Sequence, residues 1–197
     1  MKKTEKIEQA RTALQTFLQG TGRKLEIEID CPIEDRIRFI YAIIFSGFKK
    51  ASFYWRFFIA RLASIIDYSP IKVFFYRSIG IKIGKGVFIS PAVILDPHFP
   101  SLIEIDDYAI IGWGVQLFTH NFSGTKYSVG RIKIGRGAVI GAFSIVRGGV
   151  TVGECAQIQA TCIVYKDVPK NGSLVSGIIL SQARTNAGQK QNGRADF

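Results

Sequence analysis

The sequence predicts an all-β solenoid, a parallel β-helix of about four coils, with an α-helical extension before it and a polar tail after it. Two observations carry this prediction. Aliphatic residues recur every six positions from Ile83 onward, and the residues before them are rich in aromatic and basic side chains without that period. With 197 residues, 47% of them hydrophobic, the chain can bury the core of one domain with an appendage.

The repeat consists of twelve six-residue units, or hexads, each of which begins with Ile, Leu or Val. A helix would show an apolar period of 3.6 and an exposed strand a period of two, so neither explains a period of six. This period is typical of a β-solenoid in which three hexads form one triangular coil and the first residue of each hexad fills the interior. The predicted first positions are 83, 89, 95, 105, 111, 117, 134, 140, 146, 152, 158 and 164.

Insertions fall only between coils, "SLIE" after the first coil and the 11-residue "SGTKYSVGRIK" after the second. The second position of a hexad is often glycine, which we interpret as a corner residue whose backbone conformation other residues resist. The repeat domain is assigned to residues 75–180, and the polar residues 181–197 are expected to be a disordered tail. The four predicted coils are residues 83–100, 105–122, 134–151 and 152–169.

Residues 1–74 are expected to form a helical, basic and aromatic N-terminal region. Residues 1–82 hold 15 Lys and Arg against 8 Asp and Glu, which accounts for most of the net charge of +11. The aromatic stretch 36–66 is interrupted by Lys and Arg, and its longest uncharged run, Phe39–Phe48, is too short to cross a bilayer. The stretch predicts either a helical cap on the open end of the solenoid or an interfacial helix pair that contacts a membrane surface.

The cysteines and the N-terminus indicate the compartment. Cys31, Cys155 and Cys162 are odd in number and lack zinc or CxxC spacing, which favours buried thiols in a reducing compartment. The first 20 residues lack the apolar core of a signal peptide. We therefore expect a cytoplasmic protein, peripheral at the inner face of the membrane if the interfacial alternative holds. Nucleic-acid binding is suggested by charge alone and is not expected.

The repeat also predicts where the two histidines lie. His98 and His120 are each the sixteenth residue of their coil, in coils one and two. Residues at equal positions of stacked coils lie about 4.8 Å apart, as in any strand ladder. The two imidazoles should therefore stack on one face, in a column that continues with Gly149 and Asp167 in coils three and four.

The segment "IGRGAVIGAFSIVRGGVTVGECAQIQATCIVYKDVPKNGSLVSG" resembles the C-terminal half of maltose, galactoside and exopolysaccharide O-acetyltransferases. These enzymes are members of the left-handed β-helix hexapeptide-repeat acyltransferase superfamily, and the resemblance covers about residues 75–178. It implies a left-handed helix, a homotrimer with active sites between neighbouring prisms, and acetyl-CoA as co-substrate with no metal required.

The resemblance places the catalytic histidine in a "TH" setting before a long loop, which points to His120 as a general base. An imidazole can take the proton of an acceptor hydroxyl while the oxygen attacks the thioester, so no serine or cysteine nucleophile is needed. The acceptor is expected to be a sugar or polysaccharide precursor. The resemblance further implies CoA contacts at Gly141, Ala142, Ala160, Thr161, Tyr165 and Lys166.

The acceptor site is less well matched. The asparagine that sugar acetyltransferases place on the first coil has no counterpart, and Ser90 or Asp96 is a candidate for that part. His98, held between two prolines, is expected to shape the acceptor site or to be structural, and Asn121 is a further acceptor candidate.

Two departures from the family pattern affect the CoA site. "QATC" replaces the usual "GAGS", which places the side chain of Thr161 where the family has glycine, and "IIL" replaces "NPA" after "VSG". These departures keep open the alternative of a catalytically silent trimeric scaffold. A γ-type carbonic anhydrase is the third alternative, but its zinc site needs three histidines and this chain has two.

Overall fold

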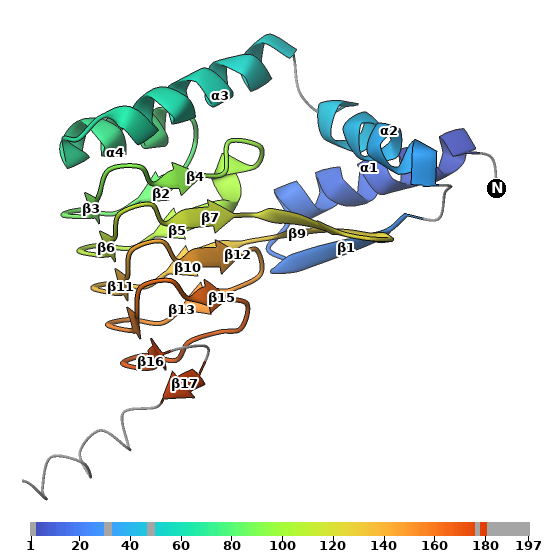
Figure 1. Cartoon of the computed structure of the whole chain (residues 1–197). Helices are drawn as coiled ribbons and strands as arrows, with labels where there is room; N and C mark the ends of the chain where they lie inside the picture. Colours follow the sequence, from blue (N-terminus) through green and yellow to red (C-terminus); the bar gives the residue numbers. More distant parts are fainter. Residues whose placement is uncertain (1–2, 30–32, 47–49, 176–177, 181–197) are drawn as a thin grey trace, which may run out of the picture.

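The computed structural model describes residues 3–29, 33–46, 50–175 and 178–180. Its main body is a β-helix with three parallel sheets, one for each side of the triangular coil (Figure 1). The first sheet contains β2 (Lys82–Ile83), β5 (Ile103–Ile105), β10 (Ile132–Ile134) and β13 (Thr151–Val152). The second contains β3 (Phe88–Ile89), β6 (Ile110–Ile111), β11 (Val139–Ile140), β14 (Gln157–Ile158) and β16 (Ser173–Val175), with β17 (Ile178–Leu180) antiparallel at its end. The third contains β4 (Ile94–Leu95), β7 (Gln116–Phe118), β12 (Ile145–Arg147) and β15 (Ile163–Val164).

The interior of the β-helix confirms the predicted hexads. All twelve predicted first positions are buried, from Ile83 at 9% exposed to Val164 at 1%. Strand pairing places equal positions side by side, as in the ladder of Ile89, Ile111 and Ile140. Because each of these side chains leaves water, the column of aliphatic residues is the main stabilising element of the body.

The glycines of the repeat have a different cause from the one predicted. At the second position the requirement is space: a Cβ on Gly141 would lie 2.4 Å from the backbone nitrogen of Ala160 in the next coil. The left-handed backbone conformation falls instead at the fourth position, where Gly137 has φ +63° and non-glycine residues such as Phe143 and Cys155 adopt similar values.

The cysteines agree only in part with the expected buried thiols. Cys155 is exposed at a corner, contrary to the expectation, whereas Cys162 is buried as expected. Cys31 lies outside the described residues.

The fourth coil is two residues shorter than predicted. Val168, rather than residue 170, takes the next first position: it is 1% exposed and pairs with Val152 in the first sheet. Leu174 follows six residues later beside Ile158. The structure therefore has four complete coils and the first part of a fifth. The predicted tail, 181–197, lies outside the described residues.

Two helices cover the first coil, α3 (Lys50–Ile65) and α4 (Ser69–Ser78), which contact each other (Figure 1). Ile59, Ala63 and Val73 belong to the same buried cluster as the interior of the β-helix. Two further groups of α4 satisfy backbone carbonyls of the first coil, since the Tyr76 hydroxyl donates to Val93 O at 2.8 Å and Lys72 Nζ donates to Ser90 O at 2.7 Å. This end of the core is thus closed by helices.

A second buried cluster lies beside the body and fixes the long insertion. After coil two the chain forms a hairpin of β8 (His120–Ser123) and β9 (Lys126–Gly130), and β1 (Lys24–Glu28) pairs antiparallel with β9. Helices α1 (Lys3–Gln19) and α2 (Ile33–Ser46) pack against each other at this sheet (Figure 1). The shared core includes Phe17, Ile29, Phe53, Phe99 and Tyr127.

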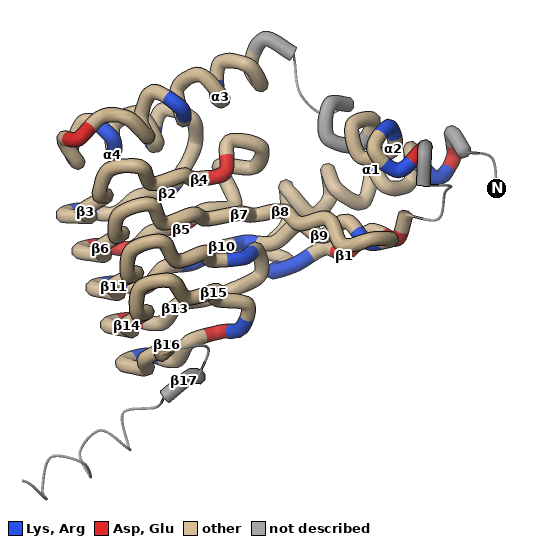
Figure 2. Tube along the Cα trace, in the orientation of Figure 1, with Lys and Arg blue, Asp and Glu red and all other residues tan. Residues whose placement is uncertain are grey.

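The N-terminal region differs from the all-helical segment 1–74 in two respects. It contains β1, and α4 continues to Ser78 because Tyr76 and Ile79 are buried in the solenoid core. The predicted pair within 36–66 is not a pair either, since α2 packs on α1 and α3 packs on α4. Figure 2 shows that charged residues lie mainly at the turns of the coils and on the N-terminal elements, while the strands of the coils are largely uncharged.

Candidate functional site

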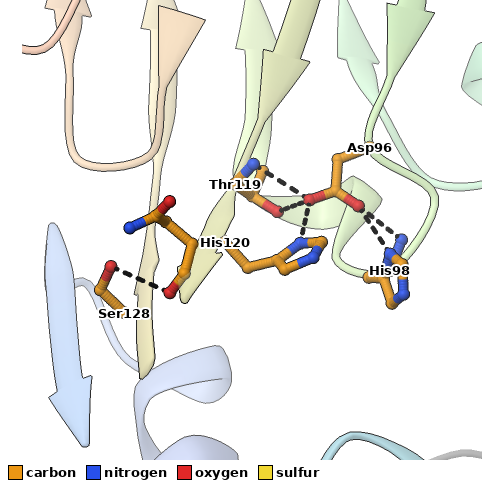
Figure 3. Close-up of polar contacts among 6 residues, drawn as sticks. Asp96, His98, Thr119, His120 and Ser128 are labelled. Carbon is orange, nitrogen blue, oxygen red and sulfur yellow. Dashed lines mark hydrogen bonds and ion pairs between the residues drawn. The ribbon is translucent and has the colours of Figure 1, made fainter. Parts of the chain in front are cut away.

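Asp96 is the centre of the hydrogen-bond network at the end of coils one and two (Figure 3). Its side chain is 1% exposed and follows β4 directly. Oδ1 accepts the backbone N–H of His98 at 2.9 Å and its Nδ1–H at 3.0 Å. Oδ2 accepts the backbone N–H and the hydroxyl of Thr119 at 3.0 and 2.5 Å, and Nδ1–H of His120 at 2.6 Å. Both carboxylate oxygens are therefore fully used inside the protein.

The carboxylate assigns the tautomer of both imidazoles. An ionised carboxylate can only accept hydrogen bonds, so each Nδ1 that contacts it carries a proton. In the neutral rings the other nitrogen, Nε2, then has a free lone pair. His98 and His120 line the same pocket, and with Nδ1 bound to Asp96 it is the Nε2 side of each ring that is left for an acceptor there.

The surroundings of Asp96 keep it ionised. Burial acts to raise its pKa, but the hydrogen bonds from His120, His98 and Thr119, with the nearby His120 ring, outweigh burial and hold the pKa of Asp96 well below its usual range. A charged carboxylate in a buried place must be well hydrogen-bonded to be tolerated. The five donors around Asp96 meet that requirement.

The two imidazoles stack as the coil register predicts, with ring centroids 4.5 Å apart and ring planes at 60°. His98 is also held by the edges of two phenylalanines from α3, Phe53 at 5.4 Å and Phe57 at 5.0 Å between centroids. His120 contacts Tyr127 of β9 at 6.0 Å. The cap helix and the hairpin therefore fix the rings from two sides.

A pocket of about 580 Å³ opens beside these rings, between α3 and the third sheet. Its wall combines three regions that are distant in sequence: the second half of α3, β4 with the residues that follow it in the first coil, and the end of the second coil. Its lining residues are Phe57, Phe58, Ala60, Arg61, Ser64, Ile94, Leu95, Asp96, Pro97, His98, Phe118 and His120.

The predicted acceptor residues are only partly brought together. His98 lines the pocket with His120. Asp96, predicted to contact the acceptor, also belongs to the lining, but it is only 1% exposed and both its oxygens accept hydrogen bonds within the protein. Ser90 is outside the pocket, at the corner before β4, where its carbonyl binds Lys72. Asn121 is also outside it, because successive residues of a strand point to opposite faces and His120 is the neighbour that faces the pocket.

The predicted CoA residues lie on coils three and four, away from that pocket. Gly141 and Ala142 form a half-buried corner, with Ala160 and Thr161 exposed directly below them, where Thr161 N donates to Ala142 O at 2.8 Å. Tyr165 and Lys166 are exposed beyond β15, and Lys166 Nζ lies 5.7 Å from the Tyr165 ring centroid. The structure thus places Gly141, Ala142, Ala160 and Thr161 next to one another, whereas the role of all six residues in CoA binding stays a prediction.

The site also contains a set of possible metal ligands. Ligand atoms of Asp96, His98 and His120 all lie within 4.8 Å of one another, a group that could hold a cation. Both Nδ1 atoms are hydrogen-bonded to the carboxylate, so an ion shared by these atoms would have to displace those bonds. The γ-type carbonic anhydrase alternative requires three histidines, and the cluster offers two and a carboxylate.

The site residues that were not identified from the sequence include Thr119, Phe57, Phe58 and Arg61. Thr119 could have been found, because it occupies the column next to the histidine column and is followed by His120 in the same way that Pro97 is followed by His98. No sequence pattern identifies the three α3 residues, because they reach the site only through the packing of α3 on the third sheet.

Comparisons with known proteins agree on one class. No protein-family model matches the chain. The chain is 30% identical over 122 residues, 61% of its own length and 70% of the relative, to "Putative acetyltransferase YvoF" of Bacillus subtilis (strain 168). It is 26% identical over 151 residues, 62% of its length and 80% of the relative, to "Putative colanic acid biosynthesis acetyltransferase WcaF" of Escherichia coli (strain K12).

Among solved structures, the hexapeptide-repeat containing acetyltransferase VCA0836 of Vibrio cholerae O1 biovar eltor, complexed with acetyl coenzyme A, matches with a TM-score of 0.55 at 18% identity. The match covers 67% of this chain and 87% of that one, and it confirms the predicted left-handed β-helix. With a relative at 30% identity matched over 70% of its length and with this repeat fold, the chain belongs to the left-handed β-helix hexapeptide-repeat acyltransferase superfamily.

Proposed function

We propose that this protein is an O-acetyltransferase that moves an acetyl group from acetyl-CoA to a hydroxyl of a sugar or polysaccharide precursor, with His120 as general base. The observation that carries the proposal is the His120 imidazole, whose Nδ1 is held by buried Asp96 at 2.6 Å while the ring lines a pocket. The names of the two relatives support acetyl transfer, and that of WcaF supports a polysaccharide precursor.

The chemistry requires one base and good alignment. His120 Nε2 accepts the proton of the acceptor hydroxyl as the hydroxyl oxygen bonds to the thioester carbonyl carbon. When the carbon–sulfur bond breaks, His120 returns that proton to the sulfur, so the products are an acetyl ester and free CoA. Asp96 acts as a positioning residue, because it fixes the tautomer and stabilises the imidazolium that forms between the two proton transfers.

The CoA side of the site is assigned to coils three and four, and the acceptor side to the pocket under α3. This assignment rests on the family resemblance for Gly141, Ala142, Ala160, Thr161, Tyr165 and Lys166. We propose a homotrimer with sites between neighbouring prisms, which is supported by three large apolar side chains that are more than half exposed on these coils: Phe143, Ile163 and Tyr165. Sedimentation of the intact chain as a monomer would contradict the trimer.

Replacing His120 by Ala tests the base. We expect the rate of CoA release from acetyl-CoA in the presence of an acceptor to fall about 10²- to 10⁴-fold, because a positioned general base contributes that much. A thiol-reactive dye and a panel of alkyl glycosides provide the assay. Ser128→Ala is the matched control, since Ser128 bonds only the Asn121 carbonyl at 3.4 Å, and it should keep the wild-type rate.

Each other outcome of this assay has a meaning. Equal turnover by wild type and His120→Ala would remove His120 as the base. No turnover by either protein with any acceptor would favour the silent scaffold. A wild-type rate that disappears with a chelator and returns with zinc would overturn the metal-free mechanism.

We further propose that α3, within the stretch 36–66, contacts the inner surface of a membrane. None of the described helices is long and apolar enough to span a bilayer. The outer side of α3 instead carries what we call the aromatic face, made of Tyr54, Trp55, Phe58 and Ile65, each at least 59% exposed. Exposed aromatics beside the exposed Arg61 are typical of a surface that meets anionic headgroups. The same helix caps the solenoid, so the two alternatives for this stretch are compatible.

Vesicle binding tests this contact. Wild-type protein should co-sediment with vesicles that contain phosphatidylglycerol, and the double variant Trp55→Ser, Ile65→Ser should bind several-fold less, because it removes two large apolar groups from the aromatic face. Tyr108→Ser, which changes a 62% exposed residue on a coil corner, serves as the control and should bind as wild type does. Equal binding by the double variant and wild type would contradict the proposal.

A further inference from the structure

The pocket beside the two histidines offers few hydrogen-bond partners to a ligand. Seven of its lining residues are apolar: Phe57, Phe58, Ala60, Ile94, Leu95, Pro97 and Phe118. Among the polar ones, Ser64 donates its hydroxyl to the Arg61 carbonyl at 2.7 Å, and Asp96 is saturated by five donors. What remains for a ligand among the side chains is the Nε2 edge of the imidazoles, the exposed guanidinium of Arg61 and the acceptor lone pairs of the Ser64 hydroxyl.

This composition suits an apolar body better than a bare sugar. A hexose carries several hydroxyls, and each one buried without a partner weakens binding about tenfold or more. A buried methylene, by contrast, strengthens binding about fourfold. A ligand can place one hydroxyl at His120 Nε2, and His98 and Arg61 can serve few others. The remaining hydroxyls of a hexose would face Phe57, Ile94, Phe118 and their apolar neighbours without a partner.

The volume and position of the pocket assign it to the acceptor. An acetyl group is far smaller than a space of about 580 Å³. The residues assigned to CoA lie on coils three and four, whereas the pocket lies between α3 and coils one and two. Phe58 links the pocket to the outside, because it lines the pocket, is 60% exposed and stacks on Trp55 with centroids 6.0 Å apart.

We propose that the acceptor is an amphipathic alcohol, in which the hydroxyl that receives the acetyl group is carried by an aliphatic or aromatic body that occupies the pocket under α3. This inference rests on the reaction and the base of the proposed function, acetyl transfer with His120, and differs from it in the acceptor, because an alcohol with an apolar body takes the place of the sugar. The body enters past Phe58, next to the aromatic face, so a lipid-borne hydroxyl can reach His120 without leaving the apolar surface.

A chain-length series tests the inference with the full-length protein and acetyl-CoA. The acceptors are primary n-alcohols from ethanol to octanol, with glucose as the polar comparator, and the readouts are CoA release and ester formation by mass spectrometry. We expect kcat/KM to rise about fourfold per methylene until the pocket is filled, and to be lowest for glucose. A flat series, or a higher kcat/KM for glucose than for octanol, would overturn the inference and leave the acetyltransferase intact.

Two variants connect the series to this pocket. Ala60→Phe fills it, and should remove most of the gain from ethanol to octanol, whereas Ile110→Phe places the same phenyl ring on an exposed part of coil two and should keep the gain. If Ala60→Phe does not fold, Phe58→Ala provides the test, because this exposed wall residue can be truncated and should reduce the gain. An unchanged gain in the folded variant would place the alcohols elsewhere and overturn the inference.

A last arm separates the acceptor from the acyl donor. Hexanoyl-CoA replaces acetyl-CoA with ethanol as acceptor. A rate that rises with the acyl chain, while it stays flat with the alcohol chain, would assign the pocket to the donor and overturn the inference. Failure of the proposed function would look different, because no alcohol and no sugar would then be acetylated by the wild-type protein.

Discussion

One column of residues runs through the four coils, and its upper half, in coils one and two, differs in chemistry from its lower half, in coils three and four, although the backbone repeat is the same. In coils one and two the column holds His98 and His120, joined by buried Asp96. In coils three and four it holds Gly149 and Asp167, joined by Arg23, which donates to the Gly149 carbonyl at 2.8 Å and to the Asp167 carboxylate at 2.6 Å. Both halves contain a hydrogen-bonded carboxylate, and the two histidines of the upper one line the pocket between α3 and the third sheet.

The difference between the halves is burial. The Asp96 side chain is 1% exposed and that of Asp167 is 49% exposed, because α3 and the hairpin cover the upper coils and leave the lower ones open. Because Asp96 is buried, its charge is tolerated only when hydrogen bonds from the protein satisfy both carboxylate oxygens. Water screens the lower ion pair and lets it contribute little. The repeat aligns these residues in one column. Helix α3 and the hairpin, which lie outside the repeat, bury one end of that column and leave the other exposed.

The largest expected effect comes from changing the two carboxylates in turn. Asp96→Asn should lower the acetyl-transfer rate about 10²- to 10⁴-fold, because an amide in this position can hold His120 in the wrong tautomer. Asp167→Asn should leave the rate within about twofold, since its partners Arg23 and the Thr151 N–H are remote from the pocket. Steady-state kinetics with acetyl-CoA compare them. Similar losses in both variants would show that burial does not separate the two halves.

The sequence predicted the regular part of the molecule far better than the irregular part. The hexads gave the buried positions and the stacked histidines because a six-residue period leaves one register for each coil. Sequence reasoning missed β1, although "RKLEIEID" alternates polar and apolar residues and Ile27 and Ile29 prove buried. It also shared the acceptor role among His98, Asp96, Ser90 and Asn121, because no repeat position tells which polar group α3 will cover.

Stability against pH gives a second contrast between the carboxylates. The folded state depresses the pKa of Asp96, so its ionised form stabilises the protein fully above the unfolded pKa of about 4, and that contribution is lost as the pH falls below it. Asp96→Asn should therefore cost about 1.5–3 kcal/mol at pH 7 and clearly less at pH 3. Urea unfolding at the two pH values measures both differences.

Asp167 supplies the control for that measurement. Its pKa is also lowered: burial opposes the shift, and the hydrogen bond from Arg23 drives it, but the side chain is half exposed. Asp167→Asn should change stability by less than about 1 kcal/mol at either pH. A cost of Asp96→Asn that stays constant between pH 7 and pH 3 would mean that the network does not depend on the charge of Asp96.

The smallest expected effect concerns Tyr127, the hairpin residue packed against His120. Its ring is 1% exposed, and its hydroxyl is the buried side-chain polar atom of the described residues that has no hydrogen-bond partner. Burial, followed by the nearby Asp96 charge, raises the pKa of Tyr127, so the hydroxyl stays neutral. Tyr127→Phe keeps the ring contact and removes the unpaired group, so stability should stay within about 1 kcal/mol of wild type or rise. Thermal unfolding and the CoA-release assay together decide its role: a tenfold loss of rate with unchanged stability would show that the hydroxyl takes part in the His120 site, and the upper half would then owe its chemistry to the hairpin as well as to Asp96.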